Sequence, residues 1–208
     1  MHSILRAVNR RDWLKLAGIS LCSTAWAGAA EAELRSQAKR NLKLAIQTGI
    51  YGQFPLAEAA RRIAADGFRG VVLDQGFADV KYDSFAPDWD AVRKITEALN
   101  RHNLKIVSHF GYFNVVDPDA ARRQRGERRI ELLIQNWKRF DCPVISLETG
   151  TLNKDSEWAE APENTSEQAY LQVRSAFERL SAAAAKTGAV LAIEPYWRNI
   201  IDSVSRTE

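Results

Sequence analysis

The feature that most constrains this chain is a regular alternation of short apolar runs with longer, helix-like segments. The apolar runs occupy residues 42–49, 70–76, 104–112, 142–150 and 189–195. The segments between them have helical apolar spacing or Pro and Gly at their ends, and they occupy 55–67, 88–103, 119–140 and 166–188. Since parallel strands need a crossover connection, strands that alternate with helices predict a parallel sheet.

Two parallel architectures fit this order, an open doubly wound sheet and a (βα)8 barrel. Residues two apart share a strand face, so Leu191 and Ile193 lie on one face of the last run and Ala192 and Glu194 on the other. The first and fourth runs repeat this pattern of a branched apolar face and a small face with a polar C-terminal tip. Barrel active sites lie at such tips. The pattern favours an α/β fold of the (βα)8 TIM-barrel type, with only about five βα units in this chain.

The N-terminal region, residues 1–32, has the features of an export signal. Arg10 and Arg11 precede a moderately apolar stretch, and small residues allow cleavage after Ala27, Ala29 or Ala32. The arrangement resembles a twin-arginine signal, which implies a periplasmic or secreted protein. An amphipathic first helix is the alternative. The apolar stretch is shorter than the ~20 residues of a membrane span, so no permanent membrane anchor is expected. The remainder, 33–208, is then the partial barrel.

Charge and cysteine content exclude some classes of protein. Four of the 29 basic residues and two of the 26 acidic ones lie in 1–32, so the remainder is almost neutral and no nucleic-acid partner is expected. Removal of the signal would remove Cys22 and leave Cys142 alone, so the mature chain could form no internal disulfide. The basic residues of 119–140 are concentrated in its first half.

Five polar side chains fall at or near the C-terminal tips of the expected strands, where they could bind a hard cation or move a proton. They are Gln47, Asp74, His109, Glu148 and Glu194. Each has a structural alternative. Asp74 and Gln47 could bond to loop backbone, and the Thr-Gly-Thr after Glu148 could form a simple turn. His109 could be a core histidine, depending on which residues of its strand face the barrel interior. If Val107 faces inward, His109 does too, whereas an inward Ser108 would turn His109 away from the mouth.

The segments "IQTGIYG", "KIVSH", "PVISLETGT" and "LAIEP", in this order, resemble the xylose-isomerase-like TIM-barrel superfamily from about residue 42 to the end. That superfamily includes sugar isomerases, sugar-phosphate epimerases and inosose dehydratases. The resemblance implies a small carbohydrate substrate and proton transfer next to a carbonyl. It also implies a divalent metal ion, either Mn, Mg, Co or Zn, with Glu194 as ligand and as acid or base. His109 matches a family histidine after the third strand that faces the substrate or the metal, so it is expected to be catalytic. From their positions at strand tips, Glu148 is expected as a further catalytic residue, and Gln47 and Asp74 are expected to bind substrate.

The chain departs from the family pattern because the other metal ligands come from later strands. A complete barrel typically has ~250 residues and eight strands. We therefore expect a truncated barrel, with a half-barrel that pairs with another chain as the alternative. Open sheet edges would favour self-association. A non-catalytic, exported carbohydrate-binding or partner protein is the second functional hypothesis. What the gene encodes after Glu208 would separate the two.

The signal hypothesis gives the first prediction. Mass spectrometry of the periplasmic protein should find a new N-terminus between residues 28 and 33. Replacement of Arg10 and Arg11 by lysine should block export, because the transport machinery requires the arginine pair. Unchanged export of the double variant would contradict the twin-arginine hypothesis.

Overall fold

The computed structural model describes residues 31–37, 41 and 43–207, and its contacts divide the chain into two units, Met1–Lys43 and Leu44–Glu208. In the first unit, residues 31–37 are helical, with an exposed ion pair of 2.7 Å between Arg35 and Glu31. The expected export signal, except for residues 31 and 32, lies outside the described residues, as does Cys22. Among the described residues, no helix has both the length and the apolar character that a membrane crossing requires.

The second unit is built on a parallel five-stranded sheet in the order β1-β2-β3-β4-β5. The strands are β1 (Ala45–Gln47), β2 (Gly70–Leu73), β3 (Lys105–Phe110), β4 (Val144–Glu148) and β5 (Val190–Glu194). Every pair of neighbouring strands is also consecutive along the chain, as in a barrel wall. The fold class predicted from the sequence, a TIM-barrel type with about five βα units, is confirmed.

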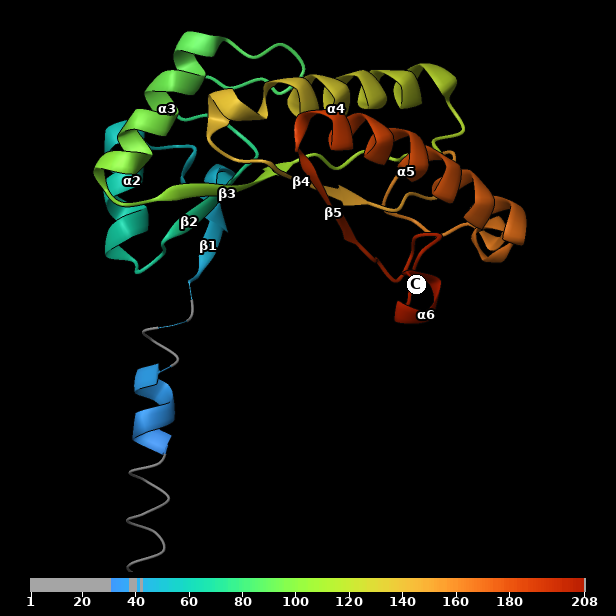
Figure 1. The fold of residues 1–208 in the computed structure, drawn as a ribbon, viewed down its shortest axis with the longest axis horizontal. Helices are drawn as coiled ribbons and strands as arrows, with labels where there is room; N and C mark the ends of the chain where they lie inside the picture. Colours follow the sequence, from blue (N-terminus) through green and yellow to red (C-terminus); the bar gives the residue numbers. More distant parts are fainter. Residues whose placement is uncertain (1–30, 38–40, 42, 208) are drawn as a thin grey trace, which may run out of the picture. The chain divides into compact units, whose positions relative to one another are not determined.

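Helices alternate with the strands and lie over one side of the sheet (Figure 1). They are α2 (Leu56–Ala65), α3 (Trp89–Arg101), α4 (Ala120–Phe140) and α5 (Glu167–Thr187). The connections also hold two short 3-10 helices, η1 (Thr48–Tyr51) and η2 (Pro162–Thr165), and the last helical turn is α6 (Val204–Thr207). The three longest helices have side-chain caps at their first turns, from Asp88, Asp119 and Ser166. Gly188, with φ of 82°, ends α5 in the left-handed conformation that glycine adopts without strain.

The core lies between the sheet and these helices. Val71, Leu73, Ile145 and Leu147 are almost completely buried on the helix-facing side. His109 lies in the same layer, because the strand register aligns it with Leu73 and with Ile145.

A register irregularity between β2 and β3 determines the orientation of the residues that follow it. Val71 pairs with Ile106 and Val72 pairs with Ser108, so Val107 has no partner in β2. A Cβ on Gly70 would lie 2.6 Å from a Val107 methyl group, so Val107 lies on the side away from the helices. Ser108 is on the same side, with its hydroxyl 2.6 Å from that of Ser146. The extra residue reverses the alternation, and His109 points into the core.

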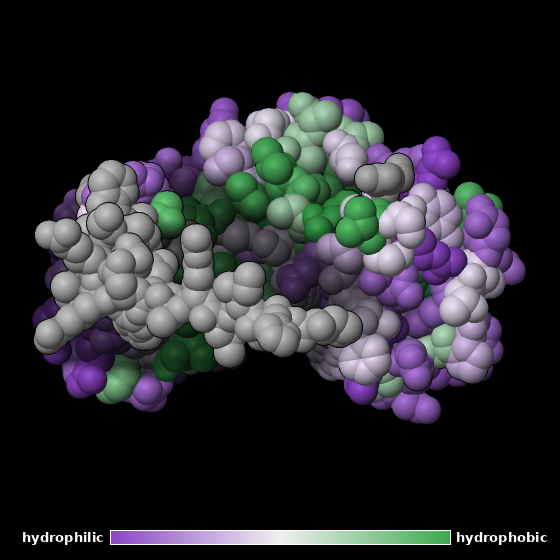
Figure 2. Space-filling view, turned by 90° about the horizontal axis from the view of Figure 1, so that it is seen from below, coloured by the Kyte–Doolittle hydropathy of each residue, from purple (hydrophilic) through white to green (hydrophobic). Residues whose placement is uncertain are grey.

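The side of the sheet opposite the helices is only partly covered. Val107 and Val190 have exposed fractions of 43% and 50% there. Figure 2 views the molecule from this side and shows apolar surface gathered toward the middle of the view, with polar surface around it. Within the described residues, β1 and β5 each have one edge without a partner strand.

This exposed surface gives the second prediction. The 208-residue chain should bind a hydrophobic dye and self-associate, because apolar side chains and free strand edges are both accessible. Val190→Lys should reduce both effects, since a lysine on an edge strand opposes pairing, whereas Val190→Ile should not. Light scattering after gel filtration and dye fluorescence would measure this. A wild-type monomer that excludes the dye would contradict it.

Candidate functional site

Two carboxylates lie side by side at the C-terminal ends of neighbouring strands. Glu148 ends β4, Glu194 ends β5, and the strand register aligns their Cα atoms. Both share a face with Ser146 and Ala192, on the side of the sheet without helices. The C-terminal ends of parallel strands in this kind of fold are where active sites lie. These two residues therefore define the candidate site.

Glu148 is a buried acid with an unused oxygen. Only 2% of the residue is exposed, and the Asn199 side-chain amide donates to Oε2 at 3.3 Å. Neither Oε1 of Glu148 nor Oδ1 of Asn199 has a hydrogen-bond partner. Burial raises the pKa of Glu148 to about 7, repulsion from Glu157 acts in the same direction, and the Asn199 hydrogen bond opposes both. Glu148 can therefore take up and release a proton near neutral pH.

Glu194 is exposed and accepts a hydrogen bond from the Tyr112 hydroxyl. Tyr112 follows β3, and its ring lies 4.3 Å from that of Phe110. The nearest arginine in the chain, Arg198, does not pair with Glu194 and places its guanidinium 4.1 Å from the centre of the Trp197 ring. No described residue forms an ion pair with Glu194. Its negative charge is therefore held by a neutral donor and stays available to a cation or a substrate hydroxyl.

The turn after Glu148 is tied to two other loops, so it is more than a simple turn. Asn114, from the segment after β3, bonds both backbone groups of Thr151, at 2.6 Å and 3.0 Å. Thr149 donates to the carbonyl of Ile201 at 3.0 Å, and the amide of Ile200 donates to the carbonyl of Gly150 at 2.9 Å. These bonds fix the segment after β5, which carries Asn199, against the end of β4.

The other three residues predicted from the sequence have different positions. Asp74 is at the tip of β2, where Oδ1 accepts from the Thr48 hydroxyl at 2.7 Å and the Gly49 amide at 2.8 Å, so one oxygen serves the loop. Gln47 is exposed at the end of β1. His109 is fully buried, 4.4 Å from the Phe140 ring, and burial lowers its pKa to about 4. We expected His109 at the mouth of the barrel, but the register irregularity at Val107 turns its side chain into the core.

Two residues of the site lacked a usable sequence signal. Tyr112 lies beyond the end of β3, and its contact with Glu194 joins residues 82 positions apart. Asn199 reaches Glu148 over 51 positions. Neither residue belongs to a motif that predicts a functional site.

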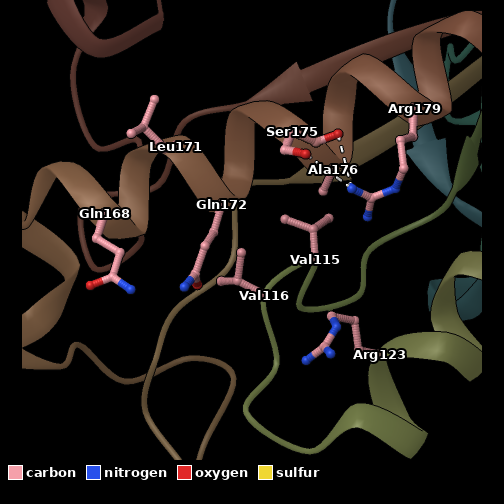
Figure 3. Close-up of a pocket in the computed structure, with 9 residues that line it drawn as sticks. All are labelled: Val115, Val116, Arg123, Gln168, Leu171, Gln172, Ser175, Ala176 and Arg179. Atoms are coloured by element: carbon pink, nitrogen blue, oxygen red, sulfur yellow. Dashed lines mark hydrogen bonds between the residues drawn. The ribbon is translucent and has the colours of Figure 1, made fainter.

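A cavity of about 480 Å³ lies elsewhere, between α5 and the segment that leads into α4 (Figure 3). Its two arginines are engaged. Arg179 bonds Ser175 and forms an ion pair of 2.9 Å with Glu127, and Arg123 donates to the carbonyl of Asp117. None of the residues that line this cavity is a carboxylate, so it offers no group for proton transfer.

The sequence from 60 to 208, more than two thirds of the chain, matches the family described as xylose isomerase-like TIM barrel. The chain belongs to that family. No curated protein matches the sequence of this xylose isomerase-like chain closely enough to be counted as a relative.

Solved structures of the same fold resemble this xylose isomerase-like chain. The 3-keto-D-glucoside 4-epimerase YcjR from E. coli is 21% identical, with a TM-score of 0.53 over 70% of this chain and 54% of its own. The probable 3-DHS dehydratase AsbF from Bacillus anthracis is 13% identical, with a TM-score of 0.61 over 80% and 57%. A xylose isomerase-like protein from Mycobacterium smegmatis in complex with magnesium is 13% identical, with a TM-score of 0.59 over 81% and 60%. The chain thus spans 54% to 60% of the length of these three structures.

The donor atoms of this xylose isomerase-like site suit a divalent cation in kind but provide only part of a ligand set. Glu148 and Glu194 offer carboxylate oxygens on adjacent strands, and Asn199 adds an amide oxygen, all hard ligands. Among the described residues, no three His, Cys, Asp or Glu side chains are grouped closely enough to hold a metal ion. The two glutamates therefore fit as partial ligands.

The two shifted pKa values predict opposing effects on stability. Unfolded Glu148 loses its proton near pH 4.5 and the folded residue near 7, so its contribution weakens folding as pH rises through that window. Unfolded His109 gains its proton near pH 6.5 and the folded residue near 4, so its contribution weakens folding as pH falls through that window. Each contribution is worth roughly 3 kcal/mol.

Urea unfolding between pH 4 and 8 would separate these contributions. Above pH 7, Glu148→Gln should be more stable than the wild type. Of the two effects, this variant should show only the loss of stability at acid pH that His109 causes. His109→Leu should show only the other effect, the loss of stability with rising pH that Glu148 causes. Parallel pH profiles for the wild type and Glu148→Gln would show that Glu148 titrates normally.

Proposed function

We propose that this protein is a sugar or sugar-phosphate isomerase or epimerase that transfers a proton at a carbon next to a carbonyl. The observation that carries the proposal is Glu148, a buried carboxyl group with an unused oxygen and a pKa raised to about 7, beside a second carboxylate. A proton-transfer group is most effective when its pKa lies near the working pH. Membership of the xylose isomerase-like family and the similarity to a 3-keto-D-glucoside 4-epimerase support the same class of reaction.

Each residue of the site has a role in this proposal. Glu148 removes the proton from the substrate carbon and returns it, and Asn199 orients its carboxyl group through the 3.3 Å hydrogen bond. Tyr112 fixes the carboxylate of Glu194, which binds a substrate hydroxyl or a metal ion. A divalent ion there, Mn, Mg, Co or Zn, would supply polarisation of the carbonyl oxygen. A structural neighbour that was solved in complex with magnesium supports a divalent ion as cofactor.

Exposed aromatic rings near the site support a carbohydrate substrate. Trp158 and Tyr196 have their ring centroids 6.3 Å apart, and Tyr196 and Trp197 are 6.0 Å apart. Trp197 has an exposed fraction of 62%. Flat apolar rings with a polar edge can pack against the apolar face of a sugar ring. We further propose that this carbohydrate-processing protein is exported to the periplasm by its N-terminal signal.

A non-catalytic carbohydrate-binding protein is the second candidate. The observation that favours it is the small ligand set, because in the described part of the chain no third His, Cys, Asp or Glu joins the two glutamates. Such a protein would use the aromatic rings and not the proton-transfer group. The two candidates therefore differ in whether hydrogen exchange occurs at the substrate carbon.

Deuterium exchange tests the proposal. The protein expressed from its complete gene is incubated with Mn²⁺ and a panel of ketoses in D2O, and label next to the carbonyl is measured by NMR. Glu148→Gln should lower the exchange rate at least ~100-fold, because an amide cannot accept the proton. Glu160→Gln, a change of an exposed acid in the loop after β4, should have no effect. Ketose binding without exchange in the wild type would favour the non-catalytic candidate.

The metal role is tested by calorimetry on the same variants. Glu194→Gln should remove Mn²⁺ binding while the melting temperature stays unchanged, since the glutamine can still accept the Tyr112 hydrogen bond. In the 208-residue chain we expect weak Mn²⁺ binding, because two carboxylates are too few ligands. Micromolar binding that survives Glu194→Gln would place the metal at other residues.

A further inference from the structure

The arginines in the first half of α4 are not used by the site described above, yet three of them line one cavity. Arg122, Arg125 and Arg129 border a space of about 330 Å³, together with Phe85 from the segment before α3 and Tyr112 from the segment after β3. This second cavity is distinct from the larger one beside α5. It lies next to the candidate site, because Tyr112 contributes to both.

Arg129 is the unusual member of this group. Only 9% of the residue is exposed, and its Nη2 donates to the Tyr112 carbonyl at 2.5 Å. Its Nε is buried without a hydrogen-bond partner, and no described carboxylate lies within ion-pair distance. Burial lowers the pKa of Arg129, but a guanidinium remains charged in proteins. A buried cation without a counter-charge is costly unless a ligand provides one.

The neighbouring charges leave the cavity positive. Arg122 is neutralised by Asp117, whose two oxygens accept from it at 2.8 Å and 2.9 Å. Arg125 forms no ion pair with a described residue. The guanidinium groups of Arg125 and Arg129 both contact the ring of Phe85, at 4.4 Å and 4.8 Å from the ring centroid. Glu157 is the one acid of the lining not paired with an arginine. Two unpaired guanidinium groups therefore face one unpaired carboxylate.

The ring of Phe85 also organises these two groups. A guanidinium that stacks on an aromatic ring still has its N–H donors pointing outward in its own plane. These donors are free to bond an oxygen anion at the edge of the guanidinium. Paired arginines with fixed orientation are suited to groups with several oxygen atoms, since each can donate two parallel hydrogen bonds. Arg129 keeps its Nε without a partner for such a bond, whereas Arg179 of the larger cavity forms an ion pair with Glu127.

We propose that this cavity binds the anionic group of the substrate, a phosphate or a carboxylate, through Arg125 and Arg129. The inference rests on the proposed function for the identity of the ligand as a sugar derivative. Tyr112 connects the two places, because its carbonyl accepts from Arg129 and its hydroxyl bonds Glu194. A sugar phosphate or sugar acid anchored here would extend along Tyr112 toward the two carboxylates. A neutral sugar would leave the charge of Arg129 unpaired.

Calorimetry with inorganic phosphate tests the proposal without requiring activity. Phosphate should bind the wild type at one saturable site. Arg125→Gln should weaken binding about tenfold or more, since it removes charge-assisted hydrogen bonds. Arg128→Gln is the matched control, an exposed arginine of the same helix outside the cavity, and should leave binding unchanged. Acetate at equal ionic strength, in place of phosphate, shows whether a carboxylate is the preferred anion.

A second variant guards against loss of the fold. Arg129→Met should melt at or above the temperature of the ligand-free wild type, because it removes the unpaired buried charge, and phosphate should no longer raise its melting temperature. Glu148→Gln should bind phosphate normally, which separates this inference from the proton-transfer proposal. No saturable phosphate or acetate binding, or equal weakening by Arg125→Gln and Arg128→Gln, would overturn the anion site.

Discussion

The long helices α3, α4 and α5 all pack on the same side of the sheet, and this one-sided cover determines which residues can do chemistry (Figure 1). Branched apolar side chains such as Ile145 and Leu147 are fully buried on the covered side. The opposite side then receives every second residue, and near the strand ends these are Ser146, Glu148 and Glu194. A carboxylate at a strand end is tolerated because it lies beside loops that can hydrogen-bond it, and not beneath a helix.

Much of this arrangement follows from the sequence, and the exception has a local cause. Period-two alternation in the last two strands correctly predicts that Glu148 and Glu194 share a face. The same rule cannot decide for His109, since one extra residue at Val107 shifts the pairing of β3 and reverses the alternation. Nothing in the composition of that strand marks the irregularity. The irregularity can be recognised only from the strand pairing in the folded structure, where Val107 lies close to Gly70.

The long-range hydrogen bonds of the site are the second feature that could not be predicted from the sequence. Asn199 and Tyr112 are ordinary loop residues until the chain folds, when the ties of Thr149 and Gly150 to the segment after β5 bring Asn199 to Glu148. Polar residues in loops satisfy backbone groups in most proteins, so their type alone gives no functional signal. The position of Asp74, which bonds the Thr48 and Gly49 groups, illustrates this ordinary role.

Glu148 and Arg129 are both buried without an ion-pair partner among the described residues, but they respond differently to burial. A carboxyl group can remain protonated, and the pKa of Glu148 rises to about 7, which removes the cost and creates a group able to exchange protons. A guanidinium has no such route, because it stays charged at any physiological pH. The cost of burying Arg129 therefore persists until an anion arrives, and the Tyr112 backbone links that event to Glu194. Tyr112 thus contacts both groups, its carbonyl at Arg129 and its hydroxyl at Glu194, so the proposed anion site and the two carboxylates share one residue.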